Sequence, residues 1–118
     1  MTSGGPPEVR MRRVAQVIRV RPEMLAEYRR LHEEVWPAVL DRIRHANIRN
    51  YSIHLRDDLL FSYFEYHGTD LAADLASMAE DPVTQRWWRL TDPCQRPLAS
   101  AGPGEWWAPA EQVFLMEE

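Results

Sequence analysis

The sequence predicts an α+β fold of the ferredoxin-like kind, in which a four-stranded antiparallel sheet carries its helices on one face. Three observations predict it. The segments follow the order β-α-β-β-α-(α)-β, with short connections over most of the chain. The β-rich runs 48–55 and 59–67 flank a short acidic turn, which is typical of a hairpin. Run 59–67 is apolar or aromatic on both faces, which indicates a strand covered on both sides. We therefore expect a second subunit on the bare face, in a homodimer of the dimeric α/β-barrel type.

The first third of the chain predicts a strand followed by an interrupted helix. Residues 13–20, RVAQVIRV, are short and rich in β-branched side chains, which favours a strand. Pro22 suits the first turn of a helix, where its missing N–H costs nothing. We expect this helix to extend from about Glu23 to His45. Because Pro37 removes one internal hydrogen bond, the helix should kink or split near Val35–Trp36.

Two further helices are predicted by their start signals. The sequence Gly68-Thr69-Asp70 ends the preceding strand, and Thr69 or Asp70 can cap a helix that continues through Glu80. Asp81 then offers a second N-cap, with Pro82 at the first helical position. We expect that helix to end near Asp92.

The last third of the chain predicts a long loop and a closing strand. Pro, Gly, Ala and Ser accumulate from 93 to 109, although Trp106 and Trp107 near the end favour a packed loop. The run EQVFLME, 111–117, predicts the last strand. At the other end of the chain, residues 1–10 are expected to be a disordered tail, which leaves 11–118 as a single domain.

Composition excludes several classes of function. The chain has 118 residues and a net charge of −4, and its fourteen basic residues are arginines spread along the sequence. This pattern does not fit a protein that binds the phosphate backbone of nucleic acid. Cys94 is the single cysteine, so an intramolecular disulfide is impossible and a reducing compartment is expected. No segment approaches the ~20 apolar residues of a membrane span, and we expect a cytoplasmic protein.

One face of the first helix combines apolar and proton-handling side chains. Steps of three and four residues place Leu25, Tyr28, His32, Val35, Val39 and Ile43 on that face. Tyr28 and His32 lie one turn apart and are neighbours. They either find buried hydrogen-bond partners in a core, or they line a cavity where His32 donates or accepts a proton near neutral pH. The spacing leaves both interpretations open.

Aromatic residues form the other candidate site. Trp87 and Trp88 are adjacent on a predicted helix and therefore point in different directions. Indole faces suit a pyranose ring, whose C–H faces are apolar and whose rim carries hydroxyls. Tyr51 lies in a predicted strand. For all three residues, packing in a core is the alternative interpretation.

No cofactor or metal is predicted. His45, His54 and His67 lack the spacing of metal ligands, either to one another or to a carboxylate. A Gly-rich phosphate-binding loop is absent from the sequence, and no Ser or Cys has the context of a nucleophile.

Together these motifs resemble the L-rhamnose mutarotase family. The resemblance covers roughly residues 11–118. It rests on Glu27-Tyr28, His32, Trp36-Pro37, the strand NYSIHL at 50–55, QRWW at 85–88, and Val113-Phe114-Leu115. It implies a ferredoxin-like homodimer that interconverts the α and β anomers of L-rhamnose without metal or organic cofactor. By the same resemblance, His32 matches the proton donor. Tyr28, Tyr51, Trp87 and Trp88 match residues that contact the sugar.

The residues also leave alternatives open. A cofactor-free monooxygenase of small aromatic substrates would use similar side chains on a similar dimeric fold, and a non-catalytic sugar- or metabolite-sensing domain would need the indoles but not the imidazole. Segment 93–107 differs from the Asn/Asp-Pro-rich stretch typical of the family, so the preferred 6-deoxy sugar stays open. So do the general base and an exchange of the C-terminal strand between subunits.

Overall fold

The computed structural model describes residues 11–117, and the predicted tail 1–10 lies outside them. The strands are β1 (Arg12–Val20), β2 (Ile48–Arg56), β3 (Leu59–Tyr66), β4 (Gln95–Arg96) and β5 (Ala108–Ala110). The helices are α1 (Leu25–Glu33), α2 (Pro37–His45), α3 (Leu71–Ala79) and α4 (Pro82–Thr91), with 3-10 turns η1 (Pro22–Met24) and η2 (Asp92–Cys94). None of the described helices is long and apolar enough to span a bilayer.

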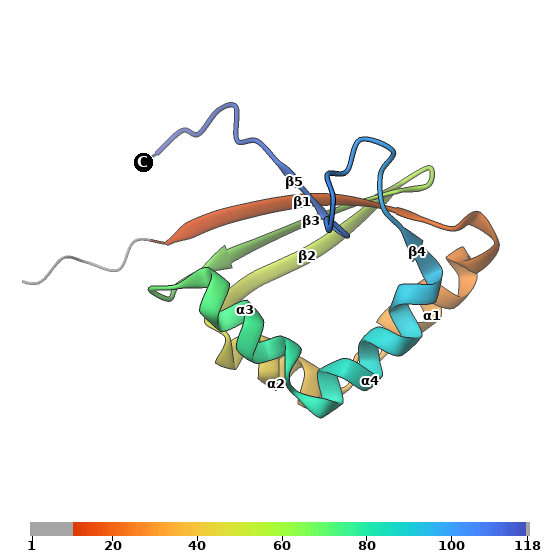
Figure 1. Cartoon of the computed structure of the whole chain (residues 1–118), viewed down its shortest axis with the longest axis horizontal. Helices are drawn as coiled ribbons and strands as arrows, with labels where there is room; N and C mark the ends of the chain where they lie inside the picture. Colours follow the sequence, from red (N-terminus) through yellow and green to blue (C-terminus); the bar gives the residue numbers. More distant parts are fainter. Residues whose placement is uncertain (1–10, 118) are drawn as a thin grey trace, which may run out of the picture.

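The sheet confirms the predicted α+β, ferredoxin-like class. Its strand order is β2-β3-β1-β4, and β5 also pairs with β1. All pairings are antiparallel. The position beside β1 is shared, because β4 pairs with Arg19–Val20 and β5 with Ala15–Val17. All four helices lie on the same side of the sheet and form an arch beneath it (Figure 1).

The predicted break in the first helix is confirmed. Residues Glu34–Trp36 separate α1 from α2, and each helix has nine residues. Trp36 has the extended ψ of 132° that a residue before proline prefers. Pro37 then takes the first helical position of α2, where it needs no hydrogen-bond partner.

Asp70, one of the two candidates for the cap of α3, and Asp81, the predicted cap of α4, both cap their helices. Asp70 accepts a hydrogen bond from the backbone N–H of Ala73 at 3.1 Å, and Asp81 accepts one from Thr84 at 2.9 Å. Each bond satisfies an N–H group that the first turn of a helix leaves without a partner. These caps fix where α3 and α4 begin.

The prediction of a closing strand at 111–117 is wrong. These residues form no strand, and Val113 and Phe114 are 90% and 79% exposed. The chain leaves β1 after Ala110 (Figure 1). A strand needs an edge partner as well as β-forming residues, and the pairing with β1 ends at β5. The strands that follow α4 are instead the short β4 and β5 inside the predicted loop.

Alternation along the central strands separates an inner face from an outer face. Strand side chains toward the helices form the core, and the largest fully buried ones are Ile18, Val20 and Leu60, joined by Cys94 of η2. The outer face, defined here as Ala15, Val17, Leu59, Phe61 and Tyr63, points away from the helices. Phe61 is 40% exposed there. In this chain, therefore, β3 is covered on its inner face and incompletely covered on its outer face.

Candidate active site

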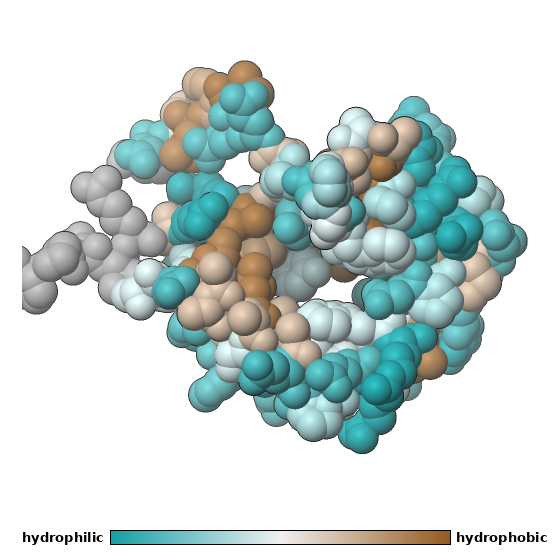
Figure 2. Space-filling view, viewed as in Figure 1, coloured by the Kyte–Doolittle hydropathy of each residue, from teal (hydrophilic) through white to brown (hydrophobic). Residues whose placement is uncertain are grey.

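A cavity of ≈ 1420 Å³ lies between the inner face of the sheet and the helices. Figure 2 shows this hollow, with apolar surface along one side of it. The residues predicted from the sequence all line it: Tyr28, His32, Tyr51, Trp87 and Trp88. The remaining members of the α1–α2 stripe line it too, and the stripe apart from His32 also packs in the apolar core, so it forms both core and cavity wall. Ligand sites are typically hollows of ~300–1,000 Å³ with aromatic walls and few polar groups.

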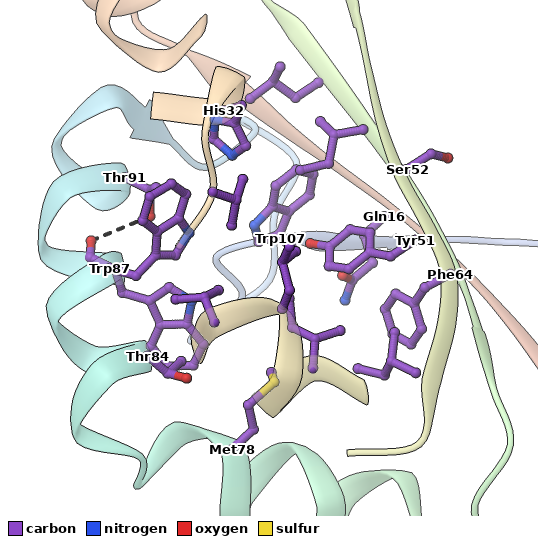
Figure 3. A pocket seen from close by; sticks show the side chains of 18 of the residues that line it. Gln16, His32, Tyr51, Ser52, Phe64, Met78, Thr84, Trp87, Thr91 and Trp107 are labelled. Carbon is purple, nitrogen blue, oxygen red and sulfur yellow. Dashed lines mark hydrogen bonds between the residues drawn. The ribbon is translucent and has the colours of Figure 1, made fainter. Parts of the chain in front are cut away.

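His32 projects from α1 into the cavity (Figure 3). Its Nδ1 lies 2.7 Å from the carbonyl oxygen of Tyr28. A carbonyl can only accept, so Nδ1 carries the hydrogen and donates it. Nε2 is then the nitrogen free for chemistry. It accepts a proton when the imidazole is neutral and donates one when the imidazole is charged.

The ring of His32 is held by aromatic neighbours. The centroid of Tyr28 lies 4.3 Å from that of His32, and Trp87 meets the imidazole edge-on at 5.5 Å. Such contacts restrict the rotation of the imidazole. The direction of Nε2 is therefore fixed by packing as well as by the bond to the Tyr28 carbonyl.

Tyr28 is 5% exposed, and its hydroxyl accepts a hydrogen bond from Gln95 Nε2 at 3.3 Å. Burial raises the pKa of Tyr28 well above its ordinary value, and the bond from Gln95 offsets part of the rise. The phenol is thus neutral over the ordinary pH range. Tyr28 can exchange hydrogen bonds with a ligand, but it is a poor base.

A β-bulge directs Tyr51 into the cavity. The register places Arg49 opposite Glu65 and Ser52 opposite Tyr63, so two residues of β2 face one of β3. Asn50, the extra residue, has a φ of 52° and donates a hydrogen bond to Glu65. Bulges re-aim side chains in this way beside functional sites. The sequence predicted a regular strand here and did not reveal the bulge.

Past the bulge, Tyr51 points toward the helices, and Ser52 points away from the cavity (Figure 3). The ring of Tyr51 packs against Phe64 with centroids 5.7 Å apart. Tyr51 is 42% exposed because the cavity itself is open to water. Its hydroxyl lies among the surrounding walls, and this burial raises the pKa of Tyr51 to about 12.

The adjacent indoles of α4 differ in environment. Trp87 is 6% exposed and packs edge-on against Trp36 at 5.3 Å, in addition to His32. Trp88 is half-buried. Both nevertheless line the cavity, so the pair offers one fixed and one more open aromatic surface. The expectation that neighbouring tryptophans have different surroundings is confirmed.

Sequence reasoning missed Gln16 and Gln95 and left open the role of Trp106 and Trp107, and all four residues line the cavity. Gln16 did carry a signal, since it shares the inner face of β1 with Ile18 and Val20 and is polar there. Trp107 lies near Tyr51 within the cavity (Figure 3). The end of the loop 93–107 thus contributes to the cavity wall. Gln95 gave no signal, because its partners are far away in the sequence.

Among residues 11–117, no group of three or more His, Cys, Asp or Glu side chains is arranged to hold a metal ion. The residues lining the cavity offer three imidazoles (His32, His54 and His67), two phenols, amide groups, several indoles and some charged side chains. This set can exchange protons, donate hydrogen bonds and stack on a flat apolar surface.

The fold and cavity define a small ferredoxin-like α+β protein whose aromatic pocket holds a proton-transfer group. The sequence model of L-rhamnose mutarotase matches residues 13–116. The chain belongs to the L-rhamnose mutarotase family, which is a family of isomerases. The assignment made from the sequence motifs is thereby confirmed.

Curated relatives carry the same name. An L-rhamnose mutarotase from Mesorhizobium japonicum is 34% identical over 84% of this chain and 91% of its own length. Another, from Jannaschia sp., is 36% identical over 66% of this chain and 74% of its own. These relatives favour the mutarotase interpretation over the monooxygenase and sensor alternatives.

Solved structures support the fold. The crystal structure of an L-rhamnose mutarotase from Formosa agariphila matches with a TM-score of 0.68 at 21% identity, covering 90% of this chain and 99% of that one. Tetracenomycin F2 cyclase from Streptomyces glaucescens matches with a TM-score of 0.63 at 16% identity, over 91% and 98% of the two chains. At these identities the likeness concerns the fold alone.

Proposed function

We propose that this protein interconverts the α and β anomers of L-rhamnose, with His32 as the group that moves the proton. One observation carries the proposal. In a chain of this family, His32 donates from Nδ1 to a backbone carbonyl and so leaves Nε2 free in an aromatic cavity. The resemblance noted in the sequence assigns the proton donor to this same residue.

The reaction needs only acid and base groups. In ring opening, the anomeric hydroxyl loses its proton, the bond between C1 and the ring oxygen breaks, and the ring oxygen gains a proton. The open-chain aldehyde then rotates about C1–C2, and ring closure on the other face returns both protons. Each positioned proton-transfer group contributes typically ~10²–10⁴-fold in rate.

The remaining predicted residues fit the binding of a 6-deoxy sugar. Tyr28 and Tyr51 supply hydroxyls for hydrogen bonds to the sugar rim, and Trp87 and Trp88 supply surfaces for its C–H faces. The methyl group of a 6-deoxyhexose favours such a wall over a hydroxymethyl by only ~1–3 kcal/mol. All 6-deoxyhexoses share this methyl group, so the family match supports our proposal of L-rhamnose as the preferred sugar, with other 6-deoxyhexoses as weaker substrates.

We also propose that two copies of the chain form a homodimer through the outer face. Phe61 is 40% exposed there. The C-terminal segment 113–116 is also apolar and exposed, including Val113 and Phe114. Exposed apolar surface on two neighbouring regions is typical of a subunit interface.

The expectation of a reducing compartment, drawn from the single Cys94, stays a prediction.

The test is saturation-transfer NMR between the anomers of L-rhamnose, L-fucose and D-glucose with the purified protein. We expect faster exchange for L-rhamnose than for either other sugar. Oxygen consumption with small aromatic substrates would support the monooxygenase alternative. Tight sugar binding without faster exchange would support the sensor alternative. Either of these results contradicts the proposal if the protein also fails to accelerate the exchange between the anomers of L-rhamnose.

A further inference from the structure

Three side chains from separate parts of the chain form a hydrogen-bonded series beside His32. The indole Nε1 of Trp106 lies 3.2 Å from Gln95 Oε1, and Gln95 Nε2 lies 3.3 Å from the Tyr28 hydroxyl. Gln95 is 4% exposed in β4, while Tyr28 belongs to α1 and Trp106 to the loop before β5. A buried amide with both ends bonded is held in one orientation.

The direction of this series is fixed by its first member. An indole N–H can only donate, so the end of the Gln95 amide that faces Trp106 is the oxygen. The NH₂ end therefore faces Tyr28, and the phenol oxygen accepts from it. The hydroxyl hydrogen of Tyr28 is not used in this bond and is available for another acceptor. Within residues 11–117, the Tyr28 hydroxyl donates to no protein acceptor, and Tyr28 lines the cavity.

Tyr28 and His32 consequently present opposite hydrogen-bonding characters. The Tyr28 hydroxyl has a hydrogen to donate, and the neutral imidazole of His32 has a lone pair on Nε2. Their rings are neighbours, with centroids 4.3 Å apart. Opening a hemiacetal needs one donor at the ring oxygen and one acceptor at the anomeric hydroxyl. The two side chains match these two needs.

We propose that Gln95, anchored by Trp106, is a positioning residue that holds the Tyr28 hydroxyl as the proton donor to the ring oxygen of the sugar. In ring opening the anomeric O–H proton passes to His32 Nε2, and its electrons form the C1=O bond. The electron pair of the bond between C1 and the ring oxygen stays with the ring oxygen, which takes the proton of Tyr28. In ring closure His32 is the proton donor to the carbonyl oxygen, and the 5-hydroxyl returns its proton to Tyr28, so no charge or electron is left over.

Gln95 itself suits Tyr28 to this role, because burial raises the pKa of the phenol, whereas the hydrogen bond from Gln95 lowers it. The ionisable neighbours that influence its pKa are Tyr51 and Cys94, and both push it upward. Burial raises the pKa of Cys94 as well, so both neighbours are neutral near pH 7. Among residues 11–117, no charged side chain is hydrogen-bonded to the Tyr28 hydroxyl.

The inference rests on the proposed function, and Gln95→Glu tests it. The introduced carboxyl is nearly the same shape, but once ionised it can only accept. It then takes the Tyr28 hydrogen and turns it away from the sugar. We expect anomer exchange of this variant to fall at least ~10-fold as pH rises through the pKa of the new carboxyl. The parental protein should lack this transition.

Tyr28→Phe supplies the matched control. Without the hydroxyl, Gln95→Glu should cost nothing further in kcat, and the added pH transition should disappear, because the two residues act through one hydrogen. Trp106→Phe frees the amide to rotate and should lower kcat several-fold with little change in KM.

The outcomes separate the two proposals. A parental protein that does not accelerate anomer exchange contradicts the proposed function. If the parental protein is active but Gln95→Glu lowers kcat equally with Tyr28 and with Phe at position 28, the positioning role alone is contradicted. Circular dichroism and thermal melts of each variant identify losses caused by misfolding. A Gln95→Glu protein that is folded and has the parental pH profile also overturns the role.

Discussion

At the residue scale, the positions of single hydrogen atoms decide the chemistry of the cavity. Nδ1 of His32 donates its hydrogen to the carbonyl of Tyr28, so the lone pair of the neutral ring lies on Nε2. The Tyr28 hydroxyl accepts a hydrogen bond from Gln95, so its own hydrogen is not donated to Gln95 and can be donated elsewhere. Neither choice is visible in the bare spacing of the two residues, which shows only that they are neighbours. Their roles follow from partners that can donate only or accept only.

Trp88 tests the stacking surface at this scale. Because it is half-buried, Trp88→Ala should leave the fold intact and remove one face of the sugar site. Losing ~1–1.5 kcal/mol of aromatic contact corresponds to about a tenfold rise in KM for L-rhamnose, with a smaller change in kcat. Steady-state anomer-exchange kinetics measure this. Leu90→Ala is the control, since Leu90 is exposed on the same helix and does not line the cavity. Equal KM values for the two variants would contradict the stacking role.

At the element scale, local signals predicted most boundaries. Pro37 divides α1 from α2, and Asp70 and Asp81 cap α3 and α4, because these effects act within one turn of the chain. The bulge at Asn50 and the short strands β4 and β5 were not predicted. They depend on how a strand registers with its neighbour, which is decided by residues far away in the sequence.

Asn50 is the residue on which the direction of Tyr51 depends. Its φ of 52° is accessible to Gly and Asn but strained for a β-branched residue. Asn50→Gly should therefore fold with near-parental exchange activity. Asn50→Val should lose ~1–3 kcal/mol of unfolding free energy and much of its activity. Urea unfolding and anomer exchange measure the two quantities. A fully stable and active valine variant would show that the bulge does not direct Tyr51.

Asp74 fastens α3 to the end of β3 and gives a pH dependence. Its carboxylate accepts hydrogen bonds from Tyr66 and Asn47, and these hold its pKa below the ordinary value. A lowered pKa in the folded state means that the stabilisation is complete above the unfolded pKa of ~3.9 and is lost as pH falls through the folded pKa.

Asp74→Asn should accordingly lower Tm more at about pH 7 than at about pH 3, where the parental carboxyl is itself becoming protonated. Thermal melts monitored by circular dichroism at both pH values give the difference. Asp41→Asn is a suitable control, because the pair of Asp41 with Arg44 is exposed. A deficit for Asp74→Asn that is the same at both pH values would contradict the assignment.

At the scale of the whole molecule, the arch of helices under the sheet makes a cavity that no single element contains. The α1 stripe and the α4 indoles could be predicted, because each lies within one helix. The contact of Gln95 with Tyr28 could not, because the two residues meet only after the chain has passed through the hairpin and three more helices. The family resemblance supplied what spacing left open, namely the sugar and the role of His32.

The outer face governs assembly at this scale. Phe61→Arg places a charge on the exposed outer face of β3, so it should convert the proposed dimer to a monomer. Sedimentation equilibrium of the parent and the variant measures the mass directly. Arg89→Glu, a charge change at an exposed site of α4 on the helix side of the sheet, is the control and should leave the mass unchanged. A parental chain that sediments as a monomer would contradict the proposed interface.

The most direct test of the central claim is the anomer-exchange rate of His32→Asn. The asparagine amide can replace Nδ1 in the bond to the Tyr28 carbonyl, but it brings no equivalent of Nε2. His45→Ala, at an exposed site outside the cavity, is the control. We predict a folded His32→Asn protein whose exchange of L-rhamnose anomers is ~10²–10⁴-fold slower than that of the parent and of the control. A folded His32→Asn protein that exchanges the anomers at the parental rate would contradict the account.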